Sequence, residues 1–213
     1  MLQTHTVSPE LLALIRQLCS LPELEKFHLA GGTAIALQIG HRKSIDIDFF
    51  TPFSFDANEL KSSLEASYQL RTNELLKNGL LGEINGIKAD FLSHQYSLLE
   101  EPVVQDGVRM YHLTDLAAMK LNAIVGNGTR LKDYVDVAFL SSRFCLEEMI
   151  DCFTRKYPLS NGMMAFKSLA HRVDIRFDVA IDYTAVSLSW EQVNERIEAM
   201  LMEPAKLFPP LTN

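Results

Sequence analysis

The sequence is poor in the features that mark secreted, membrane and zinc proteins. Its 213 residues include three cysteines, Cys19, Cys145 and Cys152, an odd number at scattered positions. A disulfide framework needs paired cysteines and a zinc site needs closely spaced Cys and His ligands, so neither is indicated, and we expect the cysteines to pack in the core. The sequence shows no signal peptide and no long apolar run, so we expect a cytoplasmic protein without a membrane partner.

Excess positive charge is also missing. The formal net charge is −7, with 20 Lys and Arg against 27 Asp and Glu. This balance argues against a broad basic surface for non-specific duplex binding, although a small RNA held by a local patch stays compatible with it. The hydrophobic share of 47% and the charged share of 22% are ordinary for a globular protein. The length allows one compact unit or two closely packed ones.

The order of the expected elements predicts an α+β protein with a mixed sheet. We expect strands over 27–30, 45–50, 68–76, 80–84 and 87–92, helices over 9–21, 33–39 and 56–68, and a loop over 98–108. The composition then shifts to helices, expected over 115–125, 130–141, 146–157, 162–170 and 190–202. Thr114 and Thr129 are the expected caps of the first two. We therefore predict a core domain over 1–108 and a helical C-terminal part over 109–213 that closes its cleft.

The stretch FHLAGGTAIALQIGHRKSIDIDFF, residues 27–50, contains the candidate site. In a strand over 45–50, alternation places one set of side chains on an apolar face and another on a polar face. The apolar set is Ile45, Ile47 and Phe49, and the polar set is Ser44, Asp46 and Asp48. Two carboxylates about 6 to 7 Å apart on one face repel by about 2 to 3 kcal/mol at an effective dielectric near 20. A bound Mg²⁺ offsets this repulsion, and so do solvent or basic partners on a wet edge strand.

Two glycines come shortly before these acids. Gly31, Gly32 and Thr33 follow an apolar strand and open a helix. Glycine permits a left-handed turn and a close backbone approach, and a helix start presents N–H groups and the positive end of the helix dipole. Such a start suits a triphosphate, although the same residues could form only a tight strand-to-helix turn. An anion site directly before a cation-binding acid pair is the arrangement that nucleotidyl transfer needs.

A second strand repeats the acidic pattern. Asn85-Gly86 predicts a hairpin turn that leads into the segment IKADFL, residues 87–92. On that strand Asp90 lies on the polar face, beside Lys88 and Leu92. Asp90 is therefore the candidate third carboxylate of a two-cation site, with an ordinary exposed strand acid as the alternative.

Several basic residues accompany the acids. His41, Arg42 and Lys43 precede the first acidic strand, where Arg42 or Lys43 could contact nucleotide phosphates or could belong to a solvated loop. Lys120 falls on the apolar stripe of its helix, where an ammonium is costly unless paired. We consider two roles for it: a buried pair with Asp133 or Asp136, or a contact with the triphosphate.

The order of these motifs carries a family resemblance. LAGGTAIALQIGHRKSIDIDFF, IKADFLSH and LTDLAAMKLNAIVGNGTRLKDYVDVAFL follow one another along the chain. Together they resemble the signature of the nucleotidyltransferase superfamily, with Gly-Gly-Thr in place of the commoner Gly-Ser. More narrowly, they resemble the AbiEii/AbiGii-type toxin nucleotidyltransferases. The likeness is strong over roughly residues 27–140 and weak at both ends.

The resemblance implies a nucleotidyltransferase fold and Mg²⁺-dependent transfer of a nucleoside monophosphate from an NTP. It implies two Mg²⁺ ions on the catalytic carboxylates Asp46, Asp48 and Asp90. It also implies a nucleotide site made by Gly31, Gly32, Thr33, Arg42, Lys43, Ser44, Lys120, Lys132, Asp133 and Asp136. Asp136 is expected to be partly buried and to tie down Lys120 or Lys132.

The biological role implied is that of the toxin in an AbiE-like toxin–antitoxin or abortive-infection system. The acceptor could be an RNA or tRNA end or a protein, and a cognate antitoxin is an expected partner. The residues themselves leave two alternatives open. One is a metal-dependent phosphohydrolase or nuclease that uses the same carboxylates, and the other is a non-catalytic nucleotide-binding module.

Overall fold

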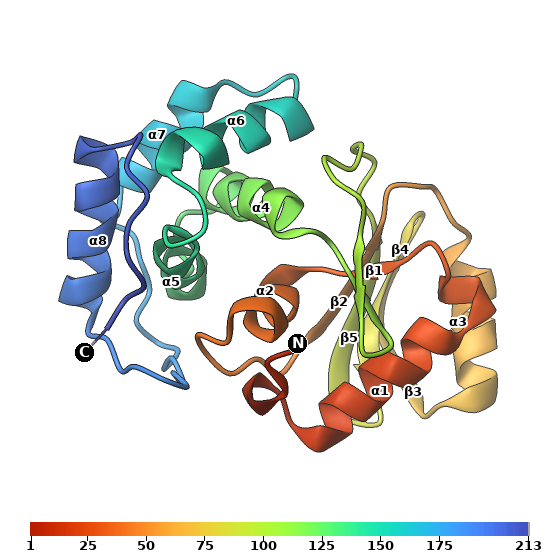
Figure 1. Ribbon diagram of the computed structural model, residues 1–213. Coiled ribbons are helices and arrows are strands. Elements are labelled where there is room, and N and C mark those ends of the chain that lie inside the picture. The colour runs from red at the N-terminus through yellow and green to blue at the C-terminus, as the bar shows by residue number, and fades with distance from the viewer. Residues whose placement is uncertain (213) are drawn as a thin grey trace. The chain divides into compact units, whose positions relative to one another are not determined.

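The computed structural model describes residues 1–212 and divides into two compact units (Figure 1). The first, here called the sheet unit, contains Met1–Ile39 and Ser44–His112. The second, here called the helical unit, contains the chain from Leu113 onwards together with Gly40–Lys43. The four-residue segment Gly40–Lys43 therefore packs with helices that lie far from it in the sequence.

The sheet unit is built on seven strands. They are β1 (His28–Leu29), β2 (Ile47–Thr51), β3 (Leu70–Leu76), β4 (Gly79–Ile84), β5 (Ile87–Ser93), β6 (Val103–Gln105) and β7 (Val108–Met110). Their order is β3-β4-β5-β2-β1-β7-β6. The β2–β5 and β1–β7 pairs are parallel and the others antiparallel. The predicted mixed sheet and the α+β class are confirmed.

Helices cover both faces of this sheet. They are α1 (Pro9–Ser20), α2 (Gly31–Ile39) and α3 (Ala57–Ser67), with 3₁₀ turns at Thr4–Thr6 and Pro22–Leu24. Figure 1 shows α2 on one side of the sheet and α1 and α3 on the other. Ser8 caps α1 by accepting from the backbone N–H of Leu11, and Asp56 caps α3. These helices lie where their apolar periodicity predicts them.

The register of β2 against β5 separates an apolar face from an acidic one. Ile47 pairs with Ala89 and Phe49 with Phe91, and the two phenylalanine rings stack with centroids 5.9 Å apart. All four side chains are buried. The expectation that Ile45 shares this face is wrong, because β2 begins only at Ile47 and Ile45 is 70% exposed.

The expected loop over 98–108 is also wrong, because this segment holds β6 and the start of β7. Asp106 and Gly107 between the two strands have φ values of 51° and 81°. Two adjacent residues in the left-handed region form the kind of turn that joins hairpin strands. Each strand has only three residues, so its sequence is too short to show the alternating pattern by which a strand is recognised. Met110 then pairs with Leu29 and extends the sheet.

The helical unit consists of five helices. They are α4 (Leu113–Gly126), α5 (Leu131–Leu140), α6 (Leu146–Lys156), α7 (Gly162–Ala170) and α8 (Trp190–Met202). Helix α4 packs against α5, α6 and α7, and α8 packs against α5 and α7. Neither predicted threonine cap is right: α4 begins at Leu113, so Thr114 lies inside it, and the N-cap of α5 is Arg130. Within the described residues, we find no helix of the length and apolarity that crossing a membrane requires.

The core of the helical unit contains an ion pair that the sequence did not suggest. Lys156 Nζ on α6 lies 2.6 Å from Asp115 Oδ1 on α4, and both side chains are fully buried. Charges in a protein interior are costly unless they are paired, so each residue requires the other. The three cysteines are buried and free, as expected.

Removing one member of this pair should destabilise the protein strongly. We expect Lys156→Met to lower the free energy of unfolding by about 3–5 kcal/mol, because it leaves the Asp115 carboxylate buried without its ammonium. The double variant Lys156→Met/Asp115→Leu should regain most of that loss. Urea unfolding at pH 7 measures both.

The matched control is the exposed pair of Arg155 and Asp151 on the same helix, 3.4 Å apart. Arg155→Met should cost less than about 1 kcal/mol. If Lys156→Met cost no more than Arg155→Met, the buried pair would not have the importance that we assign to it.

Candidate functional site

The polar face of the sheet brings two of the predicted carboxylates side by side. Asp48 on β2 is in register with Asp90 on the parallel strand β5. Residues in register on neighbouring strands point to the same face, with backbones about 4.8 Å apart. Asp46 comes just before β2 and is half-buried. The structure therefore places Asp48 beside Asp90, with Asp46 at the leading end of the same strand.

Lys88 occupies a position on this face that the sequence analysis left without a role. Its Nζ lies 2.9 Å from Asp90 Oδ2. Burial lowers the pKa of Lys88, but Asp90, Asp48 and Asp46 together raise it above its ordinary value. All three carboxylates thus act on one ammonium group. In the sequence, this contact is indicated only by the fact that Lys88 and Asp90 are two residues apart on one strand, which places their side chains on the same face.

The carboxylates fit a magnesium site in chemistry but are not gathered into a cage. Among residues 1–212, no three His, Cys, Asp or Glu side chains come close enough together to hold a metal ion. Asp90 is only 6% exposed, and its Oδ1 is buried without a hydrogen-bond partner among the described residues. Buried acceptors are normally satisfied, and carboxylate oxygens are the ligands that Mg²⁺ takes. Asp90 Oδ1 beside Asp48 therefore meets the requirements of a cation ligand.

The start of α2 lies against Asp48. Gly31 is the first residue of the helix, so the predicted turn is part of the first helical turn. Its φ is +64°, and a Cβ at this position would lie 2.2 Å from Asp48 Oδ2. Only glycine fits here, for both its conformation and its space. Gly31 and Gly32 thus bring the first-turn backbone of α2 close to the carboxylate of Asp48.

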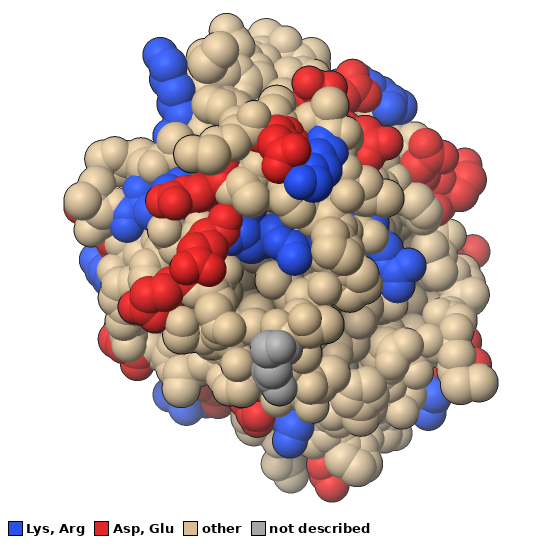
Figure 2. All heavy atoms as spheres, turned by 60° about the vertical axis from the view of Figure 1, so that its left-hand side comes forward, with Lys and Arg blue, Asp and Glu red and all other residues tan. Residues whose placement is uncertain are grey.

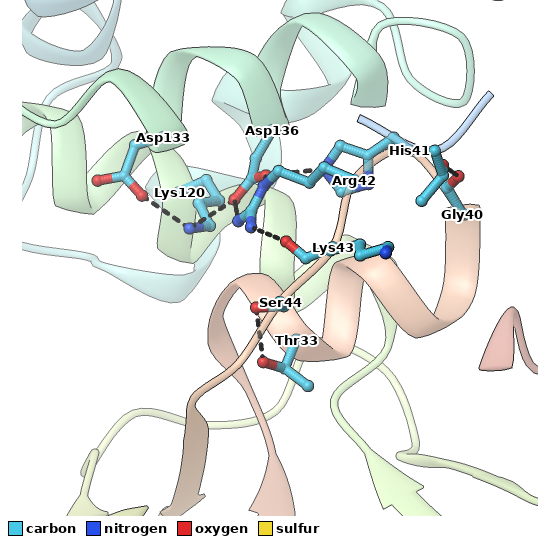
Figure 3. A network of polar contacts seen from close by, with 10 residues as sticks. Thr33, Gly40, His41, Arg42, Lys43, Ser44, Lys120, Asp133 and Asp136 are labelled. Atoms are coloured by element: carbon cyan, nitrogen blue, oxygen red, sulfur yellow. Dashed lines mark hydrogen bonds and ion pairs between the residues drawn. The ribbon is translucent and has the colours of Figure 1, made fainter. Parts of the chain in front are cut away.

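Thr33 and Ser44 fix the chain where it enters β2. The Thr33 hydroxyl donates to the Asp46 carbonyl oxygen at 2.5 Å. It is also hydrogen-bonded to the Ser44 hydroxyl at 2.8 Å (Figure 3). The backbone N–H of Ser44 donates to the Thr6 carbonyl oxygen at 2.9 Å. Both side chains therefore hold the first turn of α2 against the strand that carries Asp46 and Asp48.

Other predicted residues form a buried cluster within the helical unit, centred on Asp136. Its carboxylate is fully buried and accepts two hydrogen bonds from Arg42, from Nε at 2.7 Å and from Nη2 at 2.9 Å (Figure 3). His41 Nε2 lies 2.8 Å from it, and Lys120 Nζ also lies 2.8 Å from it. Lys120 Nζ lies 2.7 Å from Asp133 Oδ1 as well. We call these five residues the Asp136 cluster.

Several residues predicted for the nucleotide site make their contacts within the Asp136 cluster. Lys120 is paired with Asp133 and Asp136, which is the buried pairing considered from the sequence. Arg42 is 3% exposed and presents its guanidinium edge to Asp136, the two-pronged geometry that suits a carboxylate. His41 is the member that sequence reasoning missed, because nothing in its spacing relates it to a residue 95 positions away.

The remaining predicted cations are more exposed. Lys43 is exposed and lies 3.7 Å from Asp182, and Lys132 is half-buried. Lys132 lines a cavity of about 280 Å³ at the start of α5, together with Arg130 and Arg176. On the face in Figure 2, basic and acidic side chains are interspersed, and the basic ones do not gather into a broad patch.

Opposing effects set the ionisation of the Asp136 cluster. Burial raises the pKa of Asp136, but Arg42, Lys120 and His41 hold it well below its usual range. Burial lowers the pKa of His41, and Asp136 offsets this only in part. Burial also lowers the pKa of Lys120, but Asp136 and Asp133 raise it above its ordinary value. At neutral pH these shifts keep Asp136 ionised, Lys120 protonated and His41 neutral.

These shifts predict two losses of stability on acidification. Unfolded histidine takes up a proton below about pH 6.5, whereas folded His41 resists it, so its contribution is lost as the pH falls from there. The contribution of Asp136 is lost below about pH 3.9, the pKa of an unperturbed aspartate. We expect His41→Asn to flatten the decline in unfolding free energy between pH 6.5 and 5 while the steeper decline below pH 4 remains.

Urea unfolding at a series of pH values measures this, with the exposed His5→Asn as the control that leaves the profile unchanged. An unaltered slope in His41→Asn would show that this imidazole does not resist protonation.

Comparison with known proteins identifies the family. A family model described as nucleotidyl transferase AbiEii toxin, type IV TA system, matches residues 13–97 and 83–205. The uncharacterized protein aq_aa25 of Aquifex aeolicus (strain VF5) is 31% identical over 195 residues, which are 89% of this chain and 93% of that protein.

Two solved structures from H. pylori share the fold. One is described as a nucleotidyltransferase, with a TM-score of 0.59 at 17% identity over 93% of this chain and 96% of that one. The other, JHP933, has a TM-score of 0.56 at 16% identity and covers 93% of both chains. The family match over most of the sequence confirms the resemblance on which the motif analysis relied: the chain belongs to the AbiEii nucleotidyl transferase toxin family and is a nucleotidyltransferase.

Proposed function

We propose that this nucleotidyltransferase transfers a nucleoside monophosphate from an NTP to an acceptor hydroxyl, on an RNA or tRNA end or on a protein, in a Mg²⁺-dependent reaction. The observation that carries the proposal is the placement of Asp48 in register with Asp90, next to the glycine start of α2. The proposed cation site and the proposed anion site are therefore adjacent within the sheet unit. Nucleotidyl transfer requires both at the phosphorus that is attacked.

The carboxylates would hold the divalent ions. Asp48 and Asp90 contribute neighbouring oxygens, of which Asp90 Oδ1 is buried and without a partner among the described residues. Asp46, just before β2, adds a third carboxylate. Bound divalent ions supply positive charge for the acceptor hydroxyl and for the departing pyrophosphate. The carboxylates position that charge, and Asp46, Asp48 and Asp90 are the proposed catalytic residues.

The first turn of α2 would bind the phosphates. Gly31, Gly32 and Thr33 begin a helix, so their backbone N–H groups and the helix dipole favour an anion. The missing Cβ of Gly31 leaves room for the Asp48 carboxylate against this turn, which brings the proposed phosphate site next to the proposed ion site. The Thr33 hydroxyl contributes indirectly, because its bonds to Asp46 and Ser44 hold this turn in place.

The resemblance also assigns charged residues of the helical unit to nucleotide binding. Arg42 and Lys120 are already held by Asp136 and Asp133, so we do not expect these two to supply free positive charge. Lys43 and Lys132 are more exposed and remain the proposed phosphate contacts among the lysines.

The cellular role we propose is that of a toxin whose nucleotide transfer inactivates a cell component. The description of its family as type IV toxin–antitoxin proteins supports this role and a cognate antitoxin as partner. An abortive-infection function follows from the same resemblance.

The first test removes single carboxylates. We expect Asp48→Asn and Asp90→Asn to lower nucleotide transfer by at least about 100-fold, because each loses a charge that positions the divalent ions. Purified protein is incubated with each labelled NTP, Mg²⁺ and total RNA or lysate protein, and both labelled acceptor and pyrophosphate are measured. Glu74→Gln, an exposed acid on β3 of the same sheet, is the control and should retain full activity.

Each other outcome has a defined meaning. Transfer that persists in both aspartate variants would reject the assigned carboxylates. Nucleotide cleavage without an acceptor and without pyrophosphate would indicate a phosphohydrolase or nuclease, and binding without turnover would indicate a nucleotide-binding module.

The second test uses two glycines with similar backbone conformations. Gly31 and Gly86 have φ values of +64° and +80°, but only Gly31 faces a close neighbour, since a Cβ at Gly86 meets nothing within 4 Å. Gly31→Ala should displace Asp48 and abolish transfer, whereas Gly86→Ala should cost about 1 kcal/mol of stability and keep activity. Transfer assays with urea unfolding separate the two effects. Equal activity in the two variants would contradict the role of Gly31.

A further inference from the structure

We propose that Lys88 is a built-in cation that competes with the divalent ion for the carboxylates of the sheet unit. The proposal rests on the proposed function, because it takes Asp46, Asp48 and Asp90 as the ion site. It adds a residue that regulates when that site can be filled. All the residues on which it depends belong to the sheet unit.

The contact between Lys88 and Asp90 follows from the strand itself. The two residues are two apart on β5, so their side chains leave the same face. The ammonium lies 2.9 Å from Asp90 Oδ2, which a charge-assisted hydrogen bond requires. Asp90 is buried, whereas the Lys88 side chain is 53% exposed. The ammonium therefore covers the buried carboxylate from the solvent side.

This ammonium offsets the mutual repulsion of the acids when no divalent ion is bound. Three carboxylates act on it, and without a counter-charge they would repel one another at the separations of adjacent strands. Lys88 supplies one positive charge to this group of three acids.

A divalent ion and the Lys88 ammonium cannot both bind Asp90 favourably. A carboxylate oxygen that holds the ammonium is not available to the ion, and an ion on Oδ1 of the same group would lie next to a positive charge. Either arrangement weakens ion binding. Entry of the ion therefore favours departure of Lys88.

The neighbouring strand offers Lys88 a second position. Glu83 on β4 is in register with Lys88, so the two side chains share a face with Cβ atoms about 5 Å apart. The Glu83 carboxylate is partly exposed and lies 3.6 Å from the exposed Arg71. A rotation of the flexible lysine from Asp90 to Glu83 would release the ion site without moving the backbone.

The consequence is that ion binding depends on the nucleotide. In the free protein Lys88 lowers the affinity of the carboxylates for a divalent ion. An NTP supplies phosphate oxygens as additional ligands, which compensates for the competition. The ion should therefore enter with the nucleotide rather than before it.

The experiment measures Mn²⁺ binding to the full chain without nucleotide, by electron paramagnetic resonance. We expect Lys88→Met to bind Mn²⁺ at least tenfold more tightly than the unsubstituted protein, and Lys88→Arg to bind as weakly as the unsubstituted protein. Lys61→Met removes a partly exposed lysine of α3 in the same unit and is the matched control, expected to change nothing. Lys88→Gln repeats the charge removal with a polar side chain.

A second readout follows the lysine itself. Acylation of Lys88 by an amine reagent, measured by mass spectrometry, should become faster when Mn²⁺ is added, because the ammonium leaves Asp90. An unchanged acylation rate would contradict the proposal that the metal ion displaces the Lys88 ammonium from Asp90. In EDTA, Lys88→Met should melt at a lower temperature than Lys61→Met and gain more from Mn²⁺.

The outcomes separate this inference from the proposed function. Equal Mn²⁺ affinity in the unsubstituted protein and in both Lys88→Met and Lys88→Gln would overturn the role of Lys88 and leave the ion site intact. If neither the unsubstituted protein nor Lys88→Met bound Mn²⁺ better than Asp48→Asn did, the carboxylates themselves would be rejected as an ion site.

Discussion

The parallel pairing of β2 with β5 is the constraint on which the rest of the sheet unit depends. Its register is set by apolar side chains, since Ile47, Phe49 and Phe91 must all face the buried side. A slip of one residue would turn every one of them toward the polar face and bury the acids instead. The same packing that excludes water from one face therefore fixes Asp48 beside Asp90 on the other. The proposed catalytic geometry is thus a by-product of core packing.

Each unit neutralises its own charges in a different way. In the helical unit, Asp136 is fully buried, and three basic side chains converge on it. Buried carboxylates need such partners, and this one is satisfied within the protein. In the sheet unit, the half-exposed Lys88 acts on three acids, and Asp90 Oδ1 is buried without a hydrogen-bond partner among the described residues. Both oxygens of Asp136 are paired, whereas Asp90 keeps an oxygen that can bind a further cation. Because of this contrast, we propose the divalent-ion site in the sheet unit and not at the Asp136 cluster.

The sequence predicted what depends on local pattern and missed what depends on distant contacts. Periodicity and turn residues predicted the helices, strands β2 to β5 and the alternation of side chains on β2 and β5. Those predictions were correct except at the ends of elements, as at Ile45. The β6–β7 hairpin was missed because three-residue strands carry no periodic signal. For the candidate site, the motif order indicated Asp48 and Asp90. The sequence did not indicate the pairing of Lys156 with Asp115 or of His41 with Asp136, because these residues are 41 and 95 positions apart. Such pairings are set by how helices pack, which a single sequence does not contain.

The balance of charges also bears on how a triphosphate could be accommodated. The protein has a net charge of −7, and its buried cations Arg42, Lys120 and Lys156 are all held by buried aspartates. Each of these cations is thus already engaged with a buried carboxylate, and breaking such a pair is costly. Neutralisation of an incoming polyanion must therefore come mainly from elsewhere. Helix-terminal N–H groups supply only about half an elementary charge. In our proposal, divalent ions that arrive with the nucleotide supply further positive charge, and the acidic face beside Lys88 is suited to receive them.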